Sequence, residues 1–150
     1  MVSISNPAEL KNALAQYKAS NASNPWIVLG YVSPSSIAYR QSGEGVENMV
    51  ASLKDNEAAY ILIRCQYNEK DPGFKTGVLD NKANLKDIFI AWTGPQVGII
   101  EKGKKTSHVG DAKALLQPFH AEITALNRAN FTEVNIKDRA APLSGSHVIA

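Results

Sequence analysis

The chain has 150 residues, of which 44% are hydrophobic and 20% charged, and its formal net charge is +2. This length predicts one domain with its own core, and this composition excludes disordered and fibrous proteins. The charge is too small to indicate nucleic-acid binding, no apolar run approaches the roughly 18 residues of a membrane span, and the first ten residues lack the pattern of a signal peptide. The single cysteine, Cys65, cannot form an internal disulfide, so we expect a cytoplasmic protein.

The first forty residues predict a helix followed by a hairpin. Asn6 and Glu9 are typical of a helix start, where both side chains can cap, and apolar residues at helical spacing predict a helix over residues 7–19. The apolar run at 26–32 predicts a buried strand, and residues 37–41 predict a more exposed, antiparallel partner.

The middle of the chain predicts a second helix and the longest strand. Apolar residues at i, i+3, i+4 and i+7 between positions 46 and 53 indicate the helix. Residues 58–67 then predict a strand with apolar side chains on both faces. The polar segment 68–85 is long for a loop in a compact domain, and we expect an extended hairpin there.

The last part of the chain begins with a two-faced apolar strand at 88–92. Gly94 and Pro95 end this strand, since glycine tolerates the positive φ of a turn and proline lacks a backbone donor. Residues 111–117 predict a helix, 121–126 a strand, and 130–139 a capped final helix.

This order of elements predicts an α+β fold in which a central mixed sheet has helices on both faces. We expect residues 1–140 to form the domain. The remaining residues, 141–150, are small and polar, and we expect them to be a flexible tail.

Candidate catalytic residues are few. Cys65 lies inside a strand pattern, where cysteine is usually a packing residue, and no familiar signature joins it to His108 or His120. The histidines show no metal-ligand spacing with cysteine or paired acids, and the glycines match no phosphate-binding loop. We therefore expect no enzyme activity, cofactor or metal, and we keep a Cys65-dependent enzyme as a distant alternative.

A binding surface is better supported, because lysines flank the strand at 88–92. Lys86 precedes this strand, and Lys102, Lys104 and Lys105 follow it after the apolar residues 97–100. A short run of lysines is usually only a solvated surface. Apolar residues rimmed by lysines on a rigid strand nevertheless indicate a site for an acidic protein surface.

The same region resembles a known family. The sequence Ala-Trp-Thr-Gly-Pro-Gln-Val-Gly-Ile-Ile at 91–100, Lys-Gly-Lys-Lys at 102–105, Ser-His-Val-Gly-Asp at 107–111 and Leu-Leu-Gln-Pro-Phe-His-Ala-Glu-Ile at 115–123 is similar to coactosins. Coactosins are a branch of the actin-depolymerising-factor homology, or cofilin-like, family. The similarity is strongest over residues 86–123 and extends more loosely from about residue 7 to the last helix.

The resemblance implies a sheet of about five strands between helices, and binding along the side of actin filaments without catalysis. It also implies a monomeric protein in the cytoplasm on the cytoskeleton. The composition predicts no nucleic-acid or membrane partner, and the departure of residues 102–107 from the cofilin pattern predicts weak or no binding to monomeric actin. By position in the family motif, the implied actin-binding residues are Lys86, Lys102, Lys104, Lys105, His108 and Lys113.

The chain departs from the cofilin pattern at the start of the helix that follows Lys105. Residues 102–107 are Lys-Gly-Lys-Lys-Thr-Ser, where cofilins carry a Lys-Met-x-Tyr-Ala-Ser type of start. Gly103 and Gly110 each disfavour a helix interior by about 1 kcal/mol, so we expect this helix to begin late or to order on the filament. Two alternatives stay open: a cofilin-like severing or depolymerising factor, and an adaptor of the same fold that has lost actin binding.

Overall fold

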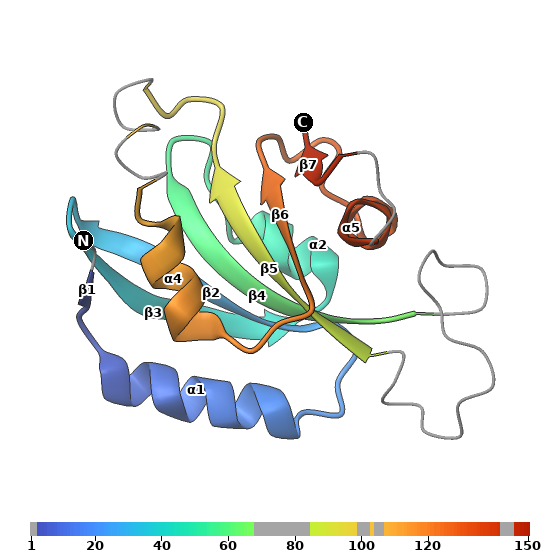
Figure 1. The fold of residues 1–150 in the computed structure, drawn as a ribbon, viewed down its shortest axis with the longest axis horizontal. Helices are drawn as coiled ribbons and strands as arrows, with labels where there is room; N and C mark the ends of the chain where they lie inside the picture. Colours follow the sequence, from blue (N-terminus) through green and yellow to red (C-terminus); the bar gives the residue numbers. More distant parts are fainter. Residues whose placement is uncertain (1–2, 68–84, 99–102, 104–106, 142–145) are drawn as a thin grey trace.

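The computed structural model describes residues 3–67, 85–98, 103, 107–141 and 146–150. Within these residues seven strands form one mixed sheet in the order β1-β3-β2-β4-β5-β6-β7 (Figure 1). The strands are β1 (Ser3–Ile4), β2 (Pro25–Ser33), β3 (Ser36–Glu44), β4 (Ala58–Gln66), β5 (Leu85–Thr93), β6 (Ala121–Ala125) and β7 (Val148–Ile149). The helices are α1 (Pro7–Ala19), α2 (Val46–Ala51), α4 (Val109–Leu116) and α5 (Glu133–Ala140). The predicted α+β fold with a mixed sheet is confirmed.

Helices cover both faces of the sheet, as predicted. On one face, α1 and α4 lie beside each other and bury Leu10, Tyr17 and Leu116 against the sheet (Figure 1). On the other face, α2 and α5 bury Met49 and Ile136. Because side chains alternate along a strand, the central strands β2, β4 and β5 supply apolar residues to both cores, which explains their nearly continuous apolar sequences.

The central pairings are antiparallel and bring the strands with the most apolar sequences together. β2 pairs with β3 and β4, and β4 pairs with β5 along its whole length, from Ala58 opposite Thr93 to Gln66 opposite Leu85. β6 then joins the other side of β5 in parallel. This register sets where each residue of β5 points, and it therefore positions the site described below.

The sheet has two more strands than expected, because β1 and β7 are each two residues long and too short for a sequence pattern. β7 lies within the segment expected to be a flexible tail. It pairs in parallel with β6, and Ile149 is only 2% exposed because it packs into the core between the sheet and α5. Residues 142–145 of that segment lie outside the described part.

The helices begin close to their predicted positions, but not all of the predicted capping side chains cap them. α1 and α5 begin close to where they were predicted, and the Thr132 side chain caps α5 by accepting from the Asn135 N–H at 3.3 Å. Asn6 makes no such cap. Its amide instead bonds both backbone groups of Tyr39, so that it ties the start of α1 to β3. α4 begins at Val109, after a turn at Ser107 and His108, although Gly103, which was expected to disfavour a helix, is itself helical.

Candidate functional site

Lys86 lies near the start of β5, on the sheet face that α2 and α5 cover. Its side chain is half-buried, and its Nζ lies 4.5 Å from the centre of the Tyr67 ring. Lys137 of α5 approaches the same ring at 5.7 Å, but it is 6% exposed and forms an ion pair with Glu133 at 3.3 Å. The aromatic ring stabilises both ammonium groups, and of the two lysines only Lys86 has substantial exposure.

The backbone at Lys86 is held in place through its neighbour Asp87, which faces the opposite side of the sheet. The Asp87 carboxylate accepts from the Tyr17 hydroxyl at 2.5 Å and from Arg64 Nε at 3.0 Å. The Asp87 N–H also donates to His120 Nδ1 at 3.0 Å. Because neighbouring residues of a strand point to opposite faces, fixing Asp87 also fixes the direction of Lys86.

Burial raises the pKa of Tyr17 above its ordinary value of 10.0, and the nearby Asp87 carboxylate raises it further. In the unfolded chain this hydroxyl ionises near pH 10, whereas in the folded protein it keeps its proton. The folded state therefore binds more protons above pH 10, and stability falls there as pH rises. This part of stability is fully present below pH 10.

The Tyr17→Phe variant tests this pH dependence. We expect the free energy of unfolding of the wild type to fall above pH 10 by up to about 1.4 kcal/mol per pH unit from this hydroxyl. The variant should be less stable at neutral pH, because Asp87 loses a donor, yet show a shallower alkaline slope. Urea unfolding at a series of pH values measures both effects, and equal slopes in the two proteins would contradict the assignment.

His108 lies just before α4, on the face opposite Lys86. It is 8% exposed, and its Nδ1 lies 2.8 Å from the Tyr31 hydroxyl, which in turn lies 2.7 Å from the Tyr60 hydroxyl. These bonds attach the beginning of α4 to β2 and β4. In this position His108 holds the helix rather than presenting its ring to solvent.

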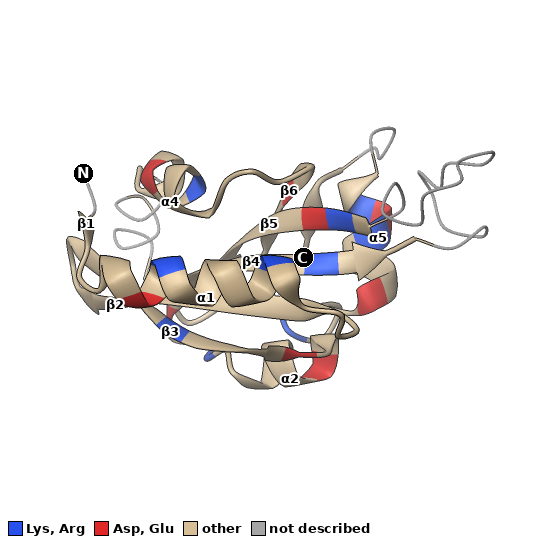
Figure 2. Cartoon of the chain, turned by 90° about the horizontal axis from the view of Figure 1, so that it is seen from below, with Lys and Arg blue, Asp and Glu red and all other residues tan. Residues whose placement is uncertain are grey.

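Lys113, on α4, forms an ion pair with Glu122 of β6 at 2.6 Å, and both side chains are substantially exposed. The predicted lysines at 102, 104 and 105 lie outside the described residues. Figure 2 shows lysine and arginine positions spread over α1, α4, α5, β4 and β5 rather than gathered on one face.

The structure does not bring all of the predicted residues together. Lys86 stands opposite Cys65 in the β4–β5 register, and Tyr60, which is linked to His108 through the Tyr31 hydroxyl, stands opposite Ala91. Five strand positions separate these pairs, roughly 16 Å at the usual rise per residue. Lys86 also faces the other side of the sheet, so it and His108 are separate features.

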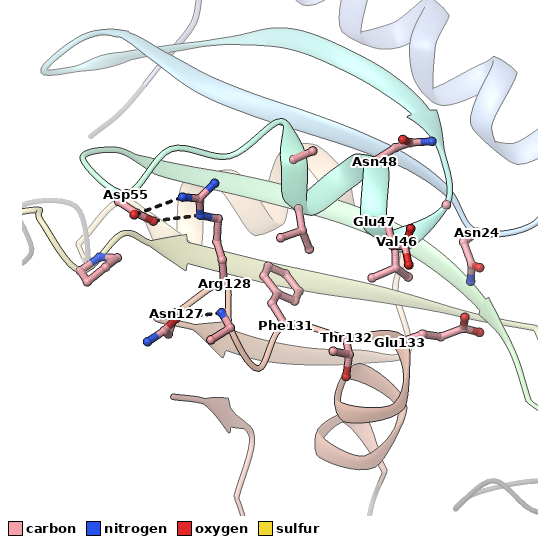
Figure 3. Close-up of a pocket in the computed structure, with 15 residues that line it drawn as sticks. Asn24, Val46, Glu47, Asn48, Asp55, Asn127, Arg128, Phe131, Thr132 and Glu133 are labelled. Atoms are coloured by element: carbon pink, nitrogen blue, oxygen red, sulfur yellow. Dashed lines mark hydrogen bonds and ion pairs between the residues drawn. The ribbon is translucent and has the colours of Figure 1, made fainter.

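A cavity of about 1050 Å³ opens between α2 and the β6–α5 connection, on the same sheet face as Lys86 (Figure 3). Phe131 and Val46 supply its apolar floor, and Glu47 and Glu133 stand at one end. At the other end Arg128 donates from Nε and Nη2 to the two carboxylate oxygens of Asp55, at 3.0 and 3.2 Å (Figure 3). No local sequence pattern indicates this ion pair, because its partners are 73 positions apart.

The thiol of Cys65 is fully buried in the core on the α2–α5 face. His108 hydrogen-bonds to Tyr31 on the opposite face, so these two residues do not form a nucleophile and base pair. In the described part of the chain, no three His, Cys, Asp or Glu side chains are grouped so as to hold a metal ion. Across the same residues, no helix is long and apolar enough to cross a membrane.

The sequence matches the family model of cofilin/tropomyosin-type actin-binding proteins over residues 1–141. The chain belongs to this family of actin-binding proteins. Among solved structures its fold is similar to that of human coactosin-like protein, with a TM-score of 0.72 and 18% identity over 91% of this chain and 95% of the other.

Two further coactosins show the same likeness. Coactosin from Entamoeba histolytica gives a TM-score of 0.65 and 21% identity over 91% of each chain. Mouse coactosin, described as an actin filament binding protein, gives 0.62 and 17% over 88% of this chain and 84% of the other. The fold that the sequence resemblance implied is therefore confirmed.

Proposed function

We propose that this protein binds along the side of actin filaments in the manner of coactosins, without catalysis. Membership of the family and the filament binding ascribed to mouse coactosin support this. The observation that carries the proposal is Lys86, a half-buried lysine held on a rigid central strand by the bonds of Asp87. A cation placed in this way loses little freedom on binding, which favours docking on an acidic surface.

In this proposal Lys86 is the principal contact, and Lys102, Lys104 and Lys105 add positive charge from the segment between β5 and α4. Lys113 can join them only by exchanging its partner Glu122 for an actin carboxylate. His108 contributes indirectly, because its hydrogen bond to Tyr31 positions the start of α4. The proposal places the protein on the cytoskeleton in the cytoplasm, as a monomer with weak or no affinity for monomeric actin.

High-speed cosedimentation with actin filaments tests the proposal. We expect the wild type to pellet with filaments at low salt, and to pellet progressively less as salt rises through about 0.1 M, where the Debye length is ~10 Å. Failure to pellet at low salt would favour an adaptor that has lost actin binding. Loss of actin from the pellet as protein is added would favour a cofilin-like severing or depolymerising factor.

A further inference from the structure

A second surface lies on the opposite side of the sheet from Lys86, between α1 and α4. It is a groove of about 390 Å³ whose walls are mostly apolar. Leu14 on α1 and Leu115 on α4 are both only half-buried along it, and Ile4 of β1 stands among its lining residues. Partly exposed leucines on two neighbouring helices leave apolar surface that a partner can cover.

Two exposed lysines of α1, Lys11 and Lys18, also line this groove. They are seven residues apart, which is two helical turns or about 10 Å along the axis. Within the part of the chain that the structure describes, no acidic residue lines the groove and neither lysine forms an ion pair. Lys113 differs, since Glu122 neutralises it. The groove therefore combines an apolar floor with positive charge that its own walls leave uncompensated.

We propose that this groove binds one amphipathic helix of a partner protein, with an apolar stripe facing Leu14 and Leu115 and two acidic residues seven positions apart facing Lys11 and Lys18. Helices commonly dock in this way, with apolar side chains at helical spacing in a groove between two other helices. Residues seven positions apart lie on the same face of a helix, two turns apart, so two acidic residues at this spacing can contact both lysines at once.

The spacing of the lysines also favours a helix over a fatty acid or similar amphiphile. One anionic head group would reach one lysine and leave the other uncompensated about 10 Å away. The groove lies on the opposite face of the sheet from Lys86, the principal actin contact proposed above, although α4 supplies both Leu115 to the groove and Lys113 to the proposed actin site. A helical partner would be a second ligand besides actin, and Lys11 and Lys18 are not among the actin contacts proposed above.

Fluorescence anisotropy with the full-length protein tests the inference. The probe is a fluorescein-labelled peptide of about 18 residues, five helical turns, with a leucine stripe and two glutamates seven positions apart. We expect saturable binding to the wild type and at least tenfold weaker binding to the double variant Lys11→Glu/Lys18→Glu. The matched control Lys54→Glu changes an exposed lysine on the α2–β4 connection, and its affinity should stay within twofold of wild type.

A charge exchange separates docking from a general loss of structure. The same peptide with both glutamates replaced by lysine should bind the double variant more tightly than it binds the wild type. No saturable binding to the wild type, equal binding to the double variant, or failure of this exchange would overturn the proposal. The proposal would also be overturned if sodium dodecanoate bound the wild type but not the double variant, and the peptide bound neither. Filament cosedimentation of the double variant should equal that of wild type, so the two proposals fail separately.

Discussion

Replacing Gly94 by alanine is expected to lower the free energy of unfolding by about 3 kcal/mol, the upper part of the range for overpacked cores. A Cβ at this position would lie 2.0 Å from the carbonyl oxygen of Asp55 and 2.4 Å from its carbonyl carbon. Both are backbone atoms, so no side-chain rotation can relieve the contact. The chain would have to move, and two nearby hydrogen bonds would be strained: Gly94 N–H to Glu57 O and Gln96 N–H to Asp55 O, each 2.9 Å.

Thermal unfolding measures this effect directly. At roughly 2–4 °C per kcal/mol for a domain of this size, the melting temperature should fall by about 6–12 °C. Gly98→Ala is the matched control, because no heavy atom of the described residues lies within 4 Å of a Cβ built there, and it should change stability by less than about 0.5 kcal/mol. Equal destabilisation by the two variants would contradict this role of Gly94.

The contact at Gly94 also shapes the cavity between α2 and α5. It presses the end of β5 against the backbone of Asp55, whose carboxylate holds Arg128 of the β6–α5 connection. Trp92 of β5 adds a bond from its indole Nε1 to the carbonyl of Lys54, at 3.1 Å. Three connections far apart in sequence are thereby joined at one end of the sheet.

The elements of this fold could be predicted because they follow local patterns of apolar residues. The helical stripe of apolar residues that includes Val46 and Met49 predicted α2. The continuous apolar runs predicted β2, β4 and β5 close to their observed bounds. These patterns depend only on which residues face a core, and a single sequence records this directly.

Contacts between distant residues could not be predicted in the same way. The sequence explained Gly94 by a positive φ, whereas among the described glycines only Gly45 has one, and Gly94 is required by the approach of Asp55. Asn6 had the chemistry of a cap but bonds β3 instead. Ile149 lies in a polar segment, and only the edge of β6 gives it a place in the core.

In the candidate site, too, local features could be predicted from the sequence and contacts between distant residues could not. Lys86 was identified from the charge pattern and the family resemblance, but nothing local indicated that Tyr67 would lie under its ammonium or that Lys137 would share that ring. The family resemblance also placed Lys86 and His108 in one set of actin-binding residues. The register and the alternation of side chains separate them onto two faces of the sheet.

Removing the charge of Lys86 is expected to weaken filament binding about tenfold, which corresponds to about 1.4 kcal/mol. Lys86→Met is the most informative change, since methionine keeps an apolar chain over Tyr67 and removes only the ammonium group. Lys86→Arg should retain most of the affinity, because a guanidinium keeps the charge and also stacks on an aromatic ring. Dissociation constants from cosedimentation at low salt measure both variants.

Two control lysines distinguish a specific contact from net charge. Lys54→Ala and Lys75→Ala remove the same charge elsewhere in the chain, and each should change the dissociation constant by less than about twofold, as expected for charges outside the contact or at its rim. If Lys86→Met, Lys86→Arg, Lys54→Ala and Lys75→Ala all bound actin filaments with the same affinity, Lys86 would not be the principal contact. If only Lys86→Met weakened binding, and its dissociation constant also depended less on salt than that of wild type, the effect would belong to the ammonium group. A purely structural defect would weaken binding without changing the salt dependence, because the remaining electrostatic attraction would be unchanged.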